Sequence, residues 1–132
     1  MVKAIFFDVF GTVVDWRSGI ANALDQAFAK SGADIKPWEL ADAWRAEIAS
    51  RLAEATGDGG KRRALSGTGR HPSRGIGESP GDADLARRLG DRDRATLERS
   101  WETLRPWPDS VLGLRALRRE YGLRPATMAR FP

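Results

Sequence analysis

Asp8 is the residue whose type and position most clearly allow chemistry in this sequence. It follows the apolar run 4–7 and precedes the pair Gly11-Thr12. A short apolar run that ends at a polar residue and a glycine predicts a buried strand over 4–7 that closes in a tight turn. Because ligands bind at the carboxyl ends of the strands in open α/β sheets, a carboxylate at this position is a candidate catalytic group.

The segment Asp8-Val9-Phe10-Gly11-Thr12 resembles the nucleophile motif of the haloacid dehalogenase (HAD) superfamily, and the aromatic residue at position 10 resembles its (S)-2-haloacid dehalogenase (type II) branch. The resemblance implies Asp8 as the nucleophile and Thr12 as a catalytic residue that orients it through a hydrogen bond. It also implies that the backbone amides of Val9 and Phe10 stabilise the carboxylate or ester oxygen.

Phe10 also bears on the reaction type. In the phosphatase branch of the superfamily this position is usually a second Asp, which acts as a general acid and base. A halide leaves as a stable anion and needs no proton, so Phe10 favours carbon–halogen cleavage. Its apolar ring also desolvates Asp8 and increases the reactivity of that carboxylate. The predicted function is hydrolysis of short 2-haloacids to 2-hydroxy acids through an aspartyl ester, with no metal and no cofactor.

A second candidate site residue is Arg45. The pair Trp44-Arg45 resembles the Trp-Arg pair of the family's cap, whose arginine holds the substrate carboxylate and the departing halide. The planar guanidinium suits this role because it binds a carboxylate through two donors and stays charged. The alternative is a solvated arginine beside a core tryptophan.

Apolar periodicity predicts the helices that position these residues. We expect helices over 17–31, ending near Gly32, and over 37–55. A third helix, capped by Asp82 or Asp84, is expected to run to 105. A fourth helix, capped by Asp109 or Ser110, is expected to run to Tyr121 and end at Gly122. A second strand is expected over 123–128.

The segment 57–81 differs in composition from the rest of the chain. It holds eight of the fourteen glycines and five Lys/Arg residues against two acidic ones, which accounts for most of the net charge of +4. With few apolar residues it cannot offset its ordering entropy, so we predict a disordered loop. Because most of the net positive charge lies in this loop and the rest of the chain is nearly neutral, we expect no nucleic-acid partner.

The fold class expected from these elements is α/β, the N-terminal part of a HAD-like Rossmannoid core with a helical cap insertion and an incomplete sheet. Residues 1–15 and 109–132 would form the partial core and 16–108 the cap-like region. The family's second strand ends in Ser or Thr, where this chain has Ala129, and its later lysine and water-positioning loop have no positions here. We therefore expect a truncated chain with little activity of its own.

Two other classes of function stay open. One is a magnesium-dependent phosphatase of the same superfamily, and the other is a non-enzymatic remnant whose segment 57–81 binds an anionic partner. The chain has no cysteine and no apolar run near the ~20 residues that span a bilayer. We expect a cytoplasmic protein with a small 2-haloacid substrate, no membrane partner and a possible homodimer.

Overall fold

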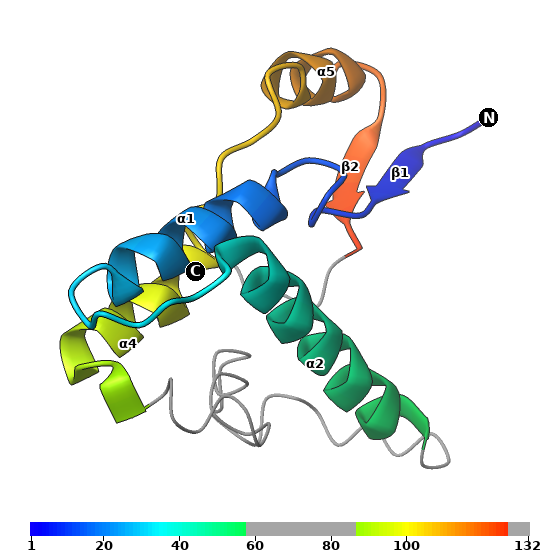
Figure 1. The fold of residues 1–132 in the computed structure, drawn as a ribbon. Helices are drawn as coiled ribbons and strands as arrows, with labels where there is room; N and C mark the ends of the chain where they lie inside the picture. The colour runs from blue at the N-terminus through cyan, green and yellow to red at the C-terminus, as the bar shows by residue number, and fades with distance from the viewer. Residues whose placement is uncertain (58–86, 127–132) are drawn as a thin grey trace.

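The computed structural model describes residues 1–57 and 87–126, and for 50–57 it describes the backbone alone (Figure 1). The fold is mixed α/β, with a two-stranded parallel sheet in the described part of the chain. Its elements, in chain order, are β1 (Ala4–Phe7), α1 (Trp16–Phe28), α2 (Pro37–Gly57), α4 (Asp91–Ser100), α5 (Ser110–Leu117) and β2 (Gly122–Pro125).

The two predicted strands are both present, and they pair in parallel. Ala4 lies opposite Gly122 and Phe7 lies opposite Pro125. A parallel pair needs a long crossover, and here the described helices all lie between the two strands in sequence. The second strand begins one residue before the predicted position 123 and ends at Pro125, short of the predicted end at 128, because Ala126 no longer belongs to it; 127 and 128 lie outside the described residues.

The first two helices begin where capping chemistry favours a helix. The Asp15 side chain accepts a hydrogen bond from the Ser18 amide at 3.1 Å, which satisfies a free donor of the first turn of α1. Pro37 is the first residue of α2, where its missing amide costs nothing. The helix predicted over 17–31 ends earlier, at Phe28, and Gly32 adopts its left-handed φ of +64° in the following turn.

The two later helices differ from the prediction. The helix expected to run to 105 is interrupted at Gly90, which is extended with ψ 158°, and α4 ends at Ser100. The last helix ends at Leu117 and does not reach Tyr121, because Gly122 is the first residue of β2 and not a helix cap. The predicted caps Asp82 and Asp84, and most of the segment 57–81, lie outside the described residues.

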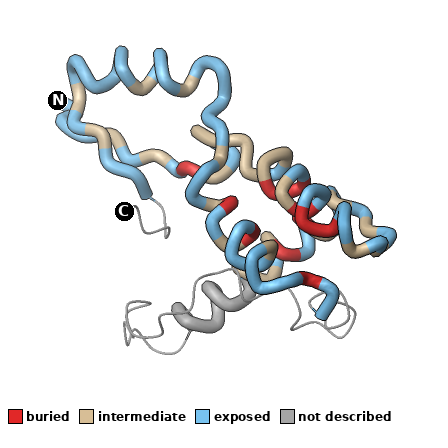
Figure 2. The backbone as a smooth tube through the Cα atoms, turned by 90° about the vertical axis from the view of Figure 1, so that its left-hand side faces the viewer, coloured by how far each residue is buried: buried red, intermediate tan, exposed pale blue. Residues whose placement is uncertain are grey.

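The buried core of the described residues is helical (Figure 2). Helix α1 packs against both α2 and α4, and the three helices lie together in Figure 1. No helix in residues 1–57 and 87–126 combines the length and apolar character needed to cross a membrane. The predicted division at 15/16 and 108/109 stays a prediction, although the whole core cluster falls between those points: Ile20, Ala21, Leu24, Ala27, Phe28, Ala41, Trp44, Leu89 and Leu97.

Candidate active site

Asp8 lies directly after the carboxyl end of β1, and its side chain is exposed. The Thr12 hydroxyl donates a hydrogen bond to its Oδ2 atom at 3.1 Å. No other described side chain forms a hydrogen bond or an ion pair with this carboxylate. Thr12 thus engages one carboxylate oxygen, and the other, Oδ1, accepts no hydrogen bond from a described side chain.

The backbone around Asp8 forms a tight turn. The buried Val9 accepts hydrogen bonds at its carbonyl from the amides of Val13 and Val14, at 2.9 and 3.1 Å. The Gly11 amide donates to the Val14 carbonyl at 3.0 Å, and Gly11 has a φ of +98°, which residues with a Cβ rarely adopt. The amides of Val9 and Phe10 donate no hydrogen bond to another described residue, so both remain able to bind an oxygen at this turn.

A distant segment of the chain braces this turn. Trp107 donates from Nε1 to the Gly11 carbonyl at 3.1 Å and from its amide to the Val13 carbonyl at 3.0 Å. The Ser110 hydroxyl donates to the same Val13 carbonyl at 2.8 Å. The loop between α4 and α5, together with the first residue of α5, therefore holds the turn that follows Asp8.

An aromatic cluster joins the turn to the helices. The ring of Phe10 meets Trp101 edge to face with centroids 5.6 Å apart. Trp101 also stacks on Trp16 at 6.1 Å and meets Trp44 edge to face at 5.5 Å. The Trp101 Nε1 atom is buried and has no hydrogen-bond partner among the described residues. Aromatic surface thus runs from Phe10 to α2.

Arg45 lies on α2 at the other end of this cluster. Its Cζ atom lies 5.9 Å from the centroid of the Trp16 ring, a cation–π contact. The guanidinium is on a half-buried residue and forms no hydrogen bond or ion pair with another described side chain. A positive charge placed on an aromatic surface in this way is available to an anion.

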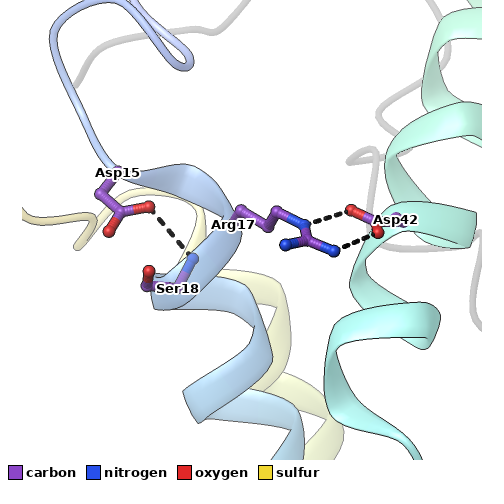
Figure 3. A network of polar contacts seen from close by, with 4 residues as sticks. All are labelled: Asp15, Arg17, Ser18 and Asp42. Carbon is purple, nitrogen blue, oxygen red and sulfur yellow. Dashed lines mark hydrogen bonds and ion pairs between the residues drawn. The ribbon is translucent and has the colours of Figure 1, made fainter.

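The neighbouring Arg17, by contrast, is fully engaged (Figure 3). It donates to both carboxylate oxygens of Asp42 at 2.7 and 2.6 Å, and it lies 5.1 Å from the centroid of the Trp38 ring. These hydrogen bonds lower the pKa of the Asp42 carboxyl and raise the pKa of Arg17. This pair connects the first turn of α1 to α2 beside Arg45.

The structure brings four of the five predicted site residues together in one turn, namely Asp8, Val9, Phe10 and Thr12. Arg45 joins them only through the aromatic cluster. Trp16 and Trp101 were not predicted as site residues, although five tryptophans among 132 residues could have suggested an aromatic cluster. Within the described ranges, no three His, Cys, Asp or Glu residues are grouped so as to hold a metal ion.

Comparison with solved structures gives two clear similarities. The chain matches the defluorinating L-2-haloacid dehalogenase Rha0230 with a TM-score of 0.69 and 32% identity, over 94% of this chain and 50% of that one. It matches the L-2-haloacid dehalogenase PA0810 with a TM-score of 0.71 and 28% identity, over 95% of this chain and 52% of that one. The chain thus spans about half the length of these enzymes. No family model matches it, and no curated protein does so.

Proposed function

Because this chain belongs to the haloacid dehalogenase superfamily and has the fold of the N-terminal part of its L-2-haloacid dehalogenases, we propose that it carries the nucleophile half of a 2-haloacid dehalogenase site. The substrate class is a short 2-haloacid, and the product is the corresponding 2-hydroxy acid. The observation that carries the proposal is the exposed Asp8 carboxylate at the end of β1, oriented by the Thr12 hydroxyl.

In the proposed reaction, an Asp8 oxygen attacks the carbon that bears the halogen, from the side opposite the halogen. The new C–O bond forms as the carbon–halogen bond breaks, and the bonding pair leaves with the halide. Water then hydrolyses the ester, which restores the Asp8 carboxylate, passes one proton to the solvent and releases a 2-hydroxy acid of inverted configuration.

The surroundings of Asp8 support an alkyl substrate. Phe10 follows it by two residues and packs on Trp101, so this position supplies an aromatic ring where a phosphatase of the superfamily usually has a second acid. The amides of Val9 and Phe10 are placed to stabilise the oxygen of the ester.

Arg45 supplies the proposed substrate-binding charge. Its guanidinium matches a carboxylate in charge and in the spacing of its donors. Contact with the Trp16 ring limits the orientations that it adopts. We assign α2 to a helical cap that presents Arg45 to the substrate, while the strand β1 presents Asp8.

The proposal is tested by titrating the Asp8→Asn variant with (S)-2-chloropropionate in a calorimeter, because this variant lacks the nucleophilic carboxylate and keeps the ligand intact. Saturable binding is expected, with clearly weaker binding of the (R) enantiomer. Adding Arg45→Ala should weaken binding by at least about tenfold, since charge-assisted hydrogen bonds contribute about 1.5–3 kcal/mol. Arg92→Ala, an exposed arginine on α4, is the matched control. Equal affinity with and without Arg45 would contradict its role.

A further inference from the structure

The backbone around Thr12 is held by hydrogen bonds on both sides of that residue. The peptide group that joins Gly11 to Thr12 has its carbonyl bound by Trp107, which donates from Nε1 at 3.1 Å. The peptide group that follows Thr12 is held by the Val13 amide, which donates to the Val9 carbonyl at 2.9 Å. Because each peptide group is planar, two held groups restrict the position of the Cα atom between them and the direction of its side chain.

The bond from Trp107 is the one that comes from a distant part of the chain, since the two residues are 96 positions apart. No other described residue forms a hydrogen bond with the peptide group between Gly11 and Thr12. Gly11 itself has a φ of +98° and, without a Cβ, has access to more backbone conformations than any other residue type. Among the described residues, the indole of Trp107 is therefore the group that limits rotation of this peptide group.

Trp107 is presented to the turn by a restricted stretch of backbone. It lies between Pro106 and Pro108. The two proline rings fix their own φ angles, and a residue that precedes a proline is biased toward extended conformations. The Trp107 amide donates to the Val13 carbonyl at 3.0 Å, and Val14 forms an isolated antiparallel bridge with Pro106. The indole donor thus extends from a backbone that is itself paired with the turn.

These contacts lead from Trp107 to the carboxylate of Asp8. Trp107 holds the peptide group before Thr12. The Thr12 hydroxyl in turn donates to Oδ2 of Asp8 at 3.1 Å. We infer, on the basis of the proposed function, that the Trp107 indole is a positioning residue for Asp8, because it keeps the Thr12 hydroxyl directed at the carboxylate. A phenylalanine at position 107 would supply a ring but no donor, so the role requires the indole nitrogen.

The first test needs no substrate. Three-bond NMR couplings about the Cα–Cβ bond of Thr12 report whether its side chain holds one rotamer. The parent should hold one, and Trp107→Phe should shift the couplings toward an average over several rotamers. Lower stability alone would not cause this shift, because the molecules that stay folded would keep the parent couplings. Trp38→Phe is the matched control, since it makes the same change at an exposed tryptophan on α2 and should leave the Thr12 couplings unchanged.

The second test follows alkylation of Asp8 by (S)-2-chloropropionate over a range of concentrations, by mass spectrometry. Trp107→Phe should lower the maximal rate by about threefold to tenfold, because the net contribution of one hydrogen bond corresponds to about that ratio. The concentration that gives half the maximal rate should not change, since Arg45, the proposed substrate-binding residue, lies on α2 and not in the turn. Trp38→Phe should react like the parent.

The route through Thr12 is tested by combining two substitutions. In a Thr12→Val protein no hydroxyl remains to be directed at Asp8. Trp107→Phe should therefore change the alkylation rate of that protein by less than about twofold. Fully additive effects of the two substitutions would overturn the inference.

The two readouts separate the inference from the proposed function. Thr12 couplings that are the same in the parent and in Trp107→Phe would overturn the inference, whatever the reactivity of the protein. Shifted couplings in a protein whose parent form is not alkylated would support the hold of Trp107 on Thr12 and contradict the proposed function. Shifted couplings with an undiminished alkylation rate would contradict the positioning role and support the proposed function.

Discussion

The Thr12 hydroxyl lies 3.1 Å from Oδ2 of Asp8 and donates a hydrogen bond to it across the turn that follows β1. The two residues are four positions apart, and the turn closes this distance because the Val9 carbonyl accepts hydrogen bonds from Val13 and Val14. This contact engages one carboxylate oxygen, and the second oxygen accepts no hydrogen bond from a described side chain.

Thr12→Val should slow alkylation of Asp8 by (S)-2-chloropropionate by about tenfold, because a hydrogen bond to a charged group contributes about 1.5–3 kcal/mol and this one is exposed. Mass spectrometry of the Asp8 peptide over time measures the rate. Thr12→Ser keeps the hydroxyl and should retain most of the alkylation rate of the parent protein. Thr96→Val removes a hydroxyl that bonds within α4 and should have no effect; a similar loss there would remove the argument for Thr12.

Gly11→Ala should destabilise the protein by about 1–2 kcal/mol, because φ at this position is +98° and the space around a new Cβ is not the obstacle. The turn that holds Asp8 should be disturbed at the same time. Urea unfolding measures the change in free energy. Gly113→Ala, in α5 with no atom near a new Cβ, should be neutral or slightly stabilising. An equal change in the free energy of unfolding for the two variants would contradict the claim that the turn at Gly11 requires a positive φ.

Trp101→Ala should cost about 3 kcal/mol or more in the free energy of unfolding, because it removes the ring that contacts Phe10, Trp16 and Trp44 together. Trp101→Phe keeps an aromatic ring and removes an indole donor that has no partner among the described residues, so it should cost much less. Urea unfolding again gives the values. A Phe variant as unstable as the Ala variant would mean that the indole nitrogen is bonded in the folded protein.

Asp42→Asn should lower the melting temperature at neutral pH and lose its effect in acid. The hydrogen bonds from Arg17 lower the folded-state pKa of Asp42. Their stabilisation is therefore present above the unfolded-state pKa, about 3.9, and is lost as the pH falls through the lower folded-state value. The difference in melting temperature between variant and parent should be small, because the pair is half-exposed. A difference in melting temperature that grows as the pH falls would contradict a lowered folded-state pKa of Asp42.

Helix α5 shows why the sequence predicted some elements better than others. The strand 4–7, the turn at Asp8 and the start of a helix at Pro37 depend on local signals, and the structure has each of them. The prediction that the strand is buried was wrong for the described residues, because its side chains are exposed or half-buried. The end of α5 depends on where β2 must begin to pair with β1, which apolar periodicity between 111 and 121 does not report. The prediction from apolar periodicity therefore placed the end of the helix too close to the strand.

The candidate site divides in the same way. Asp8 and Thr12 are close in sequence, so their motif was sufficient to place them together. The Trp107 contact with Gly11 and the stacking of Trp101 on Trp16 join segments more than eighty residues apart. Such contacts follow from packing of the folded chain, and no spacing in the sequence encodes them.

The central claim, that Asp8 is a nucleophile toward carbon, is tested most directly by mass spectrometry of the protein after incubation with (S)-2-chloropropionate. This measurement detects the first step of the reaction without requiring the ester to be hydrolysed. We predict that one carboxyethyl group is added to Asp8, that Asp8→Asn gains none, and that Asp25→Asn, an exposed carboxyl on α1, is alkylated at Asp8 like the parent. Alkylation elsewhere with Asp8 unmodified, or equal alkylation of the Asp8→Asn variant, would contradict the claim.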